Sequence, residues 1–393
     1  MSAAAANDRH RRTASLLELA RLFLRLGVTA FGGPAVHVAM MEDEVVRRRQ
    51  WLTREQFLDF LGATNLIPGP NSTEMAIHIG LVRAGWAGLL VAGVSFIAPS
   101  ALIVGVIAWI YARFGTLVQV EAQLYGVKPA AMALVAQALI RLAPTALRSW
   151  TVTLVAAACV AAAAAGMHEI VLLATAGGVM ALSTLVRRPG GLARAGLALW
   201  GAIGAGTTCA AEVAAATASV RLWPLFLVFA KAGALLYGSG YVLLAFLRAD
   251  LIERYGWLTE AQLLDAIAVG QATPGPLFTT ATFIGYILGG TPGAILATAG
   301  IFLPAFVFVA VAGPLVPRLR RSAAAGAALD GVNAAALALM AVVSWQLGRA
   351  ALVDPLTVAI AVASLIALVR FRVNSAWLIG AGALAGLASW ALA

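Results

Sequence analysis

A segment near the N-terminus of this chain occurs a second time, and this duplication limits what the chain can fold into. Residues 25–70 match residues 231–276, so that Trp51 aligns with Trp257 at an offset of 206 (257 − 51). Glycines and prolines beyond the segment align at an offset of 205. Chance does not align so many glycines, prolines and tryptophans, so we interpret the chain as two homologous halves.

The composition places both halves in a membrane. Apolar residues make up 62% of the chain, charged residues only 11%, and the mean hydropathy is +0.91. Continuous apolar runs, such as 85–111 and 152–186, have the length of membrane-spanning helices. Strands of a membrane barrel would instead show short alternating segments. The sequence therefore predicts an all-α polytopic membrane protein.

The net charge of +10 is compatible with nucleic-acid binding, but a membrane protein explains it better. Lysine and arginine accumulate in the cytoplasmic loops of such proteins. The two cysteines lie in apolar runs, which argues against a disulfide framework or a cysteine metal site. We expect no cofactor, no metal and no enzymatic activity.

The duplication divides the chain into four parts. We expect a disordered N-terminus at 1–14, a first repeat at 15–190, a linker transmembrane helix at 191–220 and a second repeat at 221–393. A single linker span inserts the second repeat upside down, which gives an inverted-topology repeat. The arginine distribution favours a cytoplasmic N-terminus. It also favours broken helices that re-enter on their own side over broken helices that cross fully.

Each half contains two places where glycine and proline interrupt an apolar helix. The first lies near residue 33 and its counterpart near residue 239, while a Pro-Gly-Pro sequence forms the second in each half. Paired broken helices point to a substrate site at mid-membrane, and free N–H groups at a helix start suit an anion. The break residues that we assign to the site are Gly32, Gly33, Pro34, Pro68, Gly69, Pro70, Gly238, Ser239, Pro274, Gly275 and Pro276. The alternative is that these residues only kink spanning helices.

Two cations occupy equivalent positions within apolar segments. Arg25 and Lys231 each lie six residues before a glycine break. A cation at membrane depth is costly and usually faces a cavity or a partner, so together they would neutralise a dianion. The alternative is that they reach towards the membrane surface. Lys128 is a third candidate, and its counterpart is Asn333.

Polar residues around the Pro-Gly-Pro breaks complete the predicted site. Glu74 and His78 lie four residues apart on one helix face, where we expect a coupling pair that binds a proton. A structural salt bridge of Glu74 is the alternative, and a metal site is less well supported. Side chains that would donate to an oxyanion are Asn65, Asn71, Ser72, Gln271, Thr273 and Thr279.

At these motifs the sequence resembles the chromate ion transporter family in its long, two-domain form. The resemblance rests on Phe31-Gly32-Gly33-Pro34, Trp51-Leu52-Thr53, Pro68-Gly69-Pro70-Asn71, Tyr237-Gly238-Ser239-Gly240-Tyr241 and Gln271-Ala272-Thr273-Pro274-Gly275-Pro276. It covers nearly the whole chain, with Ser239 standing where many members have glycine.

The resemblance implies export of chromate from the bacterial cytoplasm, coupled to the proton gradient and conferring chromate resistance. Sulfate, also a tetrahedral dianion, is the close analogue. A transporter for another anion, a channel and a membrane-embedded enzyme are the alternatives. The partners implied are a small inorganic anion and the lipid bilayer, with a homodimer as one option and no nucleic acid.

Overall fold

The structure, a computed structural model, describes residues 3–31, 33–115, 117–186, 222–237, 242–371 and 373–392. These residues form helices joined by short connections, and no strand occurs among them. The expected linker span at 191–220 lies outside the described residues. The prediction of an all-helical chain is confirmed.

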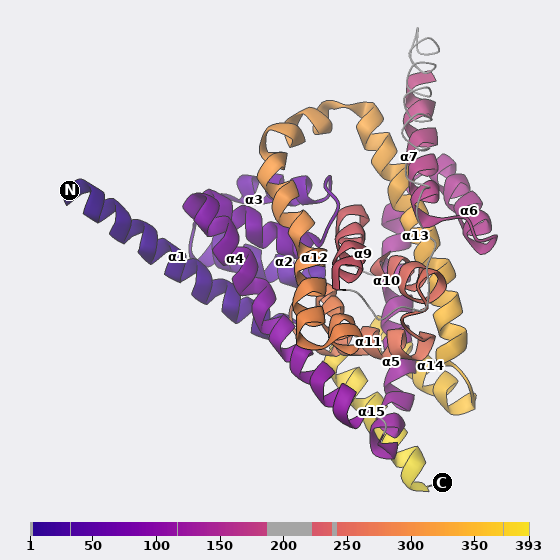
Figure 1. Ribbon diagram of the computed structural model, residues 1–393. Coiled ribbons are helices and arrows are strands. Elements are labelled where there is room, and N and C mark those ends of the chain that lie inside the picture. The colour runs from indigo at the N-terminus through magenta and orange to yellow at the C-terminus, as the bar shows by residue number, and fades with distance from the viewer. Residues whose placement is uncertain are drawn as a thin grey trace.

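The two halves contain the same succession of helices, shown from indigo to yellow in Figure 1. The first half consists of α1 (Ala3–Thr29), α2 (Pro34–Glu42), the π-helix η1 (Asp43–Arg48), α3 (Arg54–Thr64), α4 (Asn71–Phe114), α5 (Val118–Ala146), α6 (Trp150–Ala164) and α7 (Glu169–Val186). The second consists of α9 (Leu222–Leu235), α10 (Leu243–Leu247), the π-helix η3 (Arg248–Arg254), α11 (Glu260–Ala272), the 3₁₀-helix η4 (Leu277–Thr279), α12 (Thr280–Arg321), α13 (Ala323–Ala351), α14 (Pro355–Arg370) and α15 (Ser375–Leu392). Because α1 begins at Ala3, it includes residues 3–14, for which the sequence predicted disorder.

Five helices among the described residues are long and apolar enough to cross a membrane, namely α4, α5, the segment Leu277–Val311 that contains most of α12, α13 and α15. Four shorter apolar helices accompany them, within α6, α7, α9 and α14. The chain is therefore a multi-pass membrane protein.

The start of α3 shows how the sequence sets local structure. Thr53 Oγ1 accepts from the N–H of Gln56 at 3.2 Å, and the Gln56 side chain accepts from the N–H of Thr53 at 3.0 Å. Thr259 and Gln262 repeat this capping box at the start of α11. Both halves therefore begin this helix with the same capping signal.

The long helices α4 and α12 each reverse direction near one end. Ala84 and Gly85 leave the helical conformation, with Gly85 at φ 63°, and Gly289 and Gly290 do the same in α12. A Cβ on Gly80 would collide with the carbonyl of Gly88, eight residues along the chain. Contact at that separation is impossible in a straight helix, so each element consists of a short arm that folds back on a long arm.

The halves are intertwined. In the first half α5 packs against α14 and α15 of the second, while α13 of the second packs against α6 and α7 of the first (Figure 1). The helices α5 and α13 are equivalent, and each packs against the corresponding pair of helices of the opposite half. Such reciprocal contacts define a pseudo-twofold relation between the halves.

Candidate functional site

The helix breaks of the two halves are joined crosswise by two backbone hydrogen bonds. The N–H of Gly69 donates to the carbonyl of Leu236 at 2.7 Å, and the N–H of Gly275 donates to the carbonyl of Ala30 at 2.9 Å. Both donors and both acceptors are related by the same offset of 206 (275 − 69 and 236 − 30). Each Pro-Gly-Pro break therefore meets the end of the first helix of the opposite half, α9 or α1.

These bonds correct one sequence-based expectation. Gly69 and Gly275 were expected to offer their N–H groups to an anion, but both groups already donate to carbonyls. Both glycines have positive φ, 142° and 90°, a conformation that other residues adopt only with strain. Their role in the described structure is to join the halves. Gly32, Gly238 and Ser239 lie outside the described residues.

A buried carboxyl group lies at the first of these contacts, which we call the Glu74 junction (Gly69, Glu74, Leu236 and Ala305). Glu74 is fully buried, and neither carboxyl oxygen has a hydrogen-bond partner in the part of the chain that the structure describes. A Cβ on Gly69 would collide with its Oε1 and would lie 3.7 Å from the Cβ of Ala305 on α12. Among the described residues Glu74 also has no ion-pair partner, so the alternative of a structural salt bridge is not supported.

More polar atoms without partners follow on the same short arm of α4. Thr73 Oγ1 and His78 Nε2 are buried and make no hydrogen bond among the described residues. The His78 ring stacks on Phe60 of α3, with centroids 5.4 Å apart. Buried polar atoms are normally paired, so this concentration calls for a ligand, water or proton. No group of three or more metal-binding side chains occurs in the described part of the chain.

The second contact carries hydroxyl groups instead, and we call it the Thr279 junction (Ala30, Ser100, Gly275 and Thr279). Thr279 Oγ1 lies 2.8 Å from the carbonyl of Pro276 and 2.9 Å from Ser100 Oγ, and both residues are fully buried. A Cβ on Gly275 would lie 2.7 Å from the Cβ of Ser100. Sequence reasoning missed Ser100. Its counterpart at the offset of 205 is Ala305 (305 − 100), so an alignment of the two halves would have shown a hydroxyl group in one half alone.

The remaining predicted donors surround the breaks. Asn71 Nδ2 donates to Asn65 Oδ1 at 2.9 Å, and the Thr273 hydroxyl donates to the carbonyl of Val269 at 3.0 Å. Ser72 is buried, and Gln271 is half-buried. The prolines mark the ends of the breaks: Pro34 begins α2, Pro70 and Pro276 cap α4 and η4, and Pro68 and Pro274 precede the glycines.

The structure does not bring Arg25 and Lys231 together. Arg25 forms an ion pair with Glu44, and its side chain is 51% exposed in a pocket between α1 and α2. Lys231 forms ion pairs with Asp250 and, at 3.4 Å, with Glu169 of the other half. Glu44 and Asp250 are themselves equivalent (250 − 44 = 206). Each cation thus has a carboxylate of its own half, and the expected dianion between the two cations has no support in this geometry.

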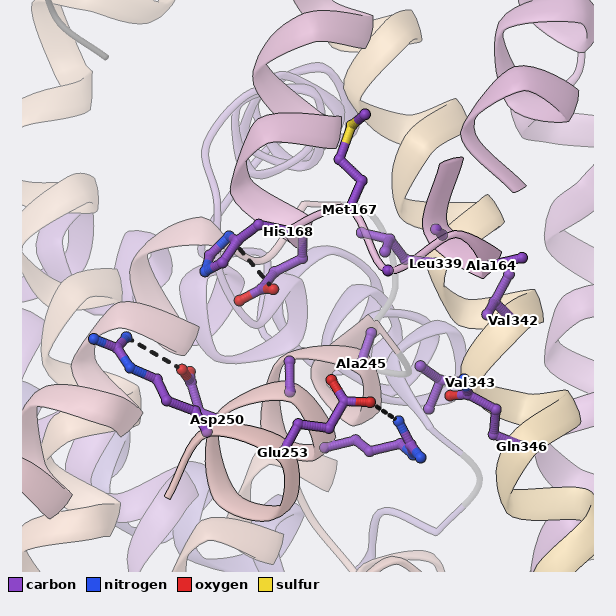
Figure 2. Close-up of a pocket in the computed structure, with 16 residues that line it drawn as sticks. Ala164, Met167, His168, Ala245, Asp250, Glu253, Leu339, Val342, Val343 and Gln346 are labelled. Atoms are coloured by element: carbon purple, nitrogen blue, oxygen red, sulfur yellow. Dashed lines mark hydrogen bonds and ion pairs between the residues drawn. The ribbon is translucent and has the colours of Figure 1, made fainter. Parts of the chain in front are cut away.

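Asp250 lines a second pocket, of about 550 Å³, many times the ~30 Å³ that one water occupies. Asp250 and Glu253 reach this pocket from η3, and His168 comes from the start of α7 (Figure 2). Burial raises the pKa of Asp250 more than Lys231 lowers it. For Glu44, burial also raises the pKa, but hydrogen bonds from Arg49 and Arg25 outweigh it, and the pKa lies below its ordinary value.

Lys128, the third candidate cation, joins the two halves elsewhere. Its Nζ lies 3.2 Å from Asp265 Oδ1, and the Tyr111 hydroxyl donates to Asp265 Oδ2 at 2.8 Å. Lys128 belongs to α5, Tyr111 to α4 and Asp265 to α11 of the second half. The sequence placed Lys128 in the membrane but did not identify its carboxylate.

Duplicated membrane helices whose breaks meet between the halves, with buried polar groups at the breaks, are typical of transporters. The family model described as "Chromate transporter" matches residues 17–182 and again 223–387. The chain therefore belongs to the chromate transporter family, as its resemblance to that family predicted.

Related proteins agree over nearly the full length. A chromate transport protein of Cupriavidus metallidurans is 33% identical over 97% of this chain and 94% of its own length. A Synechococcus elongatus protein named "Probable chromate transport protein" is 31% identical over 96% of each chain. A chromate transport protein of Pseudomonas aeruginosa is 32% identical over 83% of this chain and 80% of its own. These relatives are named as transport proteins, not as enzymes. No solved structure matches the chain.

Proposed function

We propose that this protein exports chromate across the bacterial cytoplasmic membrane, coupled to protons, and so confers chromate resistance. The names of relatives that cover nearly the whole chain support the substrate. The single structural observation that supports the site is Glu74, a buried carboxyl group without a partner where the two halves meet. Sulfate, a tetrahedral dianion of similar size to chromate, is the competitor to test.

In this proposal the oxyanion enters between the two junctions. Ser72 and Thr73 supply hydroxyl donors from the start of α4. The hydroxyl groups of Ser100 and Thr279 turn towards the anion when it binds, and they give up their bonds to Thr279 Oγ1 and to the carbonyl of Pro276. The N-terminus of α4 adds partial positive charge. An ionised Glu74 beside the site would repel a dianion, so the anion binds when Glu74 carries a proton. Proton and anion therefore bind together.

The membrane potential supports export as the direction of transport. Each charge that moves through the membrane potential is worth about 2.3 kcal/mol per 100 mV. A dianion leaving a cell that is negative inside gains ~4.6 kcal/mol per 100 mV, and about half of that remains when one proton leaves with it. Export is favoured in both cases, and the proton reduces the net charge moved from two to one.

The arrangement of halves that suits this cycle is the inverted repeat. In this proposal the first repeat (15–190) and the second (221–393) take opposite orientations in the membrane, as one crossing between them would require, and the N-terminus faces the cytoplasm. The crosswise bonds at Gly69 and Gly275 are equivalent contacts between the halves, and rocking of one half about them would open the site to one side or the other.

Inverted membrane vesicles test the function, because they turn export into uptake. Wild type should accumulate radiolabelled chromate, sulfate should compete, and the uptake should move about one net charge per chromate. Glu74→Gln should retain uptake but move two charges, since its amide cannot lose or gain the proton. The control is Glu55→Gln, an exposed carboxylate at the start of α3, which should behave as wild type. Absence of chromate uptake in wild type refutes the function, and an unchanged charge ratio in Glu74→Gln refutes the coupling role.

A further inference from the structure

A cluster of three side chains lies away from both junctions, and the proposed site does not use it. Lys128, Tyr111 and Asp265 come from three helices and from both halves. Asp265 is 3% exposed, and the side chain of Lys128 is 22% exposed. Ionised groups of this kind are rare inside a helical membrane protein, and where they occur they usually serve a pathway or a binding site.

The geometry of the cluster is that of an occupied anion site. The ammonium group of Lys128 lies 3.2 Å from one carboxylate oxygen of Asp265, and the hydroxyl of Tyr111 donates to the other at 2.8 Å. A carboxylate is an anion with two acceptor oxygens. A tetrahedral oxyanion offers acceptor oxygens in the same way, so the two donors that hold Asp265 suit such an anion equally well.

The cluster is not part of the duplicated framework. At the positions equivalent to Lys128 and Asp265 the chain has Asn333 and Asp59, and Asp59 is exposed. Lys128 has no cationic counterpart, so this pair of donors occurs on one side of the pseudo-twofold arrangement, whereas the glycine contacts occur in both halves.

We propose that Lys128 and Tyr111 form a second binding site for the transported oxyanion, and that Asp265 occupies this site when the anion is absent. The inference rests on the proposed anion transport. When the oxyanion binds, it takes over Lys128 and Tyr111, and Asp265 is displaced. When the carboxylate of Asp265 returns to Lys128, it drives the oxyanion off. Asp265 therefore acts as the release group.

Displacement leaves a buried carboxylate without its cation, which favours uptake of a proton by Asp265. The titratable or charged groups around it are Lys128 from α5 and Tyr111 from α4, with Glu121 of α5 acting on Tyr111. Among the described residues, α12, α13 and α15, which also pack near α11, contribute no ion pair or hydrogen bond to Asp265. Anion binding here should thus weaken as the pH rises and Asp265 competes in its charged form.

Equilibrium binding of radiolabelled chromate to the purified full-length protein tests this. Asp265→Asn should tighten binding on the order of tenfold, the lower end of coupling between close charge pairs, and should slow turnover. Lys128→Gln should weaken binding by a similar factor, and the charge-neutral double variant should bind no better than Lys128→Gln. The ratio of wild-type to Asp265→Asn dissociation constants should grow with pH, and the protonation of chromate itself cancels in this ratio. Asp59→Asn, the equivalent position, is the matched control and should change nothing.

A purely structural salt bridge predicts the opposite pattern. Both single variants would then weaken binding through loss of folded protein, and the double variant would recover it. That result overturns the inference, as does Asp265→Asn binding no tighter than wild type. If Asp265→Asn does not fold, the double variant decides alone: the folded double variant should bind one chromate fewer than wild type, and binding with the wild-type stoichiometry overturns the inference. Absence of chromate transport in wild type is a different result and refutes the proposed function itself.

Discussion

Removal of Lys231 should destabilise the protein far more than removal of its counterpart Arg25. Lys231→Ala leaves two buried carboxylates, Asp250 (2% exposed) and Glu169 (5% exposed), without the cation that they share. Among the described residues, Asp250 then keeps Arg254 alone, at 3.9 Å. Breaking a buried ion pair on one side costs about 3–5 kcal/mol, and protonation of Asp250 should hold the loss near ~3 kcal/mol.

Arg25→Ala removes a cation that is half exposed and that has substitutes. Glu44 keeps Arg49 at 3.1 Å and Arg48 at 3.4 Å, so the loss should be that of a surface ion pair, about 0–1 kcal/mol. The free energy of unfolding, measured by SDS titration of the purified protein in mixed micelles, should therefore differ by roughly 2–3 kcal/mol between the two variants. Equal losses would show that burial of the carboxylates does not control the energetics here.

The same experiment has an internal control. Asp250→Asn in the Lys231→Ala background removes one of the two stranded charges, so it should restore part of the lost stability. Because burial raises the pKa of Asp250, the effect of Lys231→Ala should also shrink in acid, where Asp250 is neutral in either protein. A loss that stays constant between neutral and acidic pH would contradict an electrostatic cause.

Three further predictions concern other sites. Gly69→Ala should cost about 2 kcal/mol or more, because it combines a positive φ with a collision against Glu74, whereas Gly178→Ala, in open space on α7, should be neutral or stabilising; both are measured by SDS titration. Burial raises the pKa of Asp250, so folding favours its neutral form. The free energy of unfolding should fall as the pH rises from the ordinary pKa of about 3.9 through the raised value, and Asp250→Asn should remove that slope. Glu74→Gln should leave the free energy of unfolding within ~1 kcal/mol of wild type, because an uncharged carboxyl and an amide have nearly the same shape, and a loss of several kcal/mol would indicate a partner for Glu74.

The sequence predicts the parts of this fold that depend on local chemistry. Thr53 and Thr259 begin helices because their side chains cap the following N–H groups, and this signal is readable over four residues. The duplication also predicts which residues are equivalent. It therefore places Arg25 opposite Lys231 in the alignment, and the same offset relates Glu44 to Asp250.

The sequence does not predict the contacts between the halves. Nothing in the spacing of Gly69 and Gly275 says that each donates to the other half, because the bond depends on how two distant segments pack. The sequence placed the start of an apolar run at residue 85, where α4 leaves the helical conformation, but it did not predict that the two arms fold back on each other. Lys128 was identified as a cation at depth, but its partner Asp265 lies 137 residues away (265 − 128).

The two halves are matched in backbone and unmatched in chemistry, and this combination constrains the mechanism. The crosswise bonds at Gly69 and Gly275 are equivalent, so exchanging the conformations of the halves exchanges one bond for the other at little cost in energy. Glu74 stands opposite Thr279, however, as 279 − 74 equals the offset of 205 that the later glycines share. If both junctions carried a carboxyl group that binds a proton, the two conformations of the transport cycle would be equivalent. The cycle would then have no single step at which the proton binds. With one acidic junction and one hydroxyl junction, the scaffold can alternate freely while the proton of Glu74 acts at one junction alone.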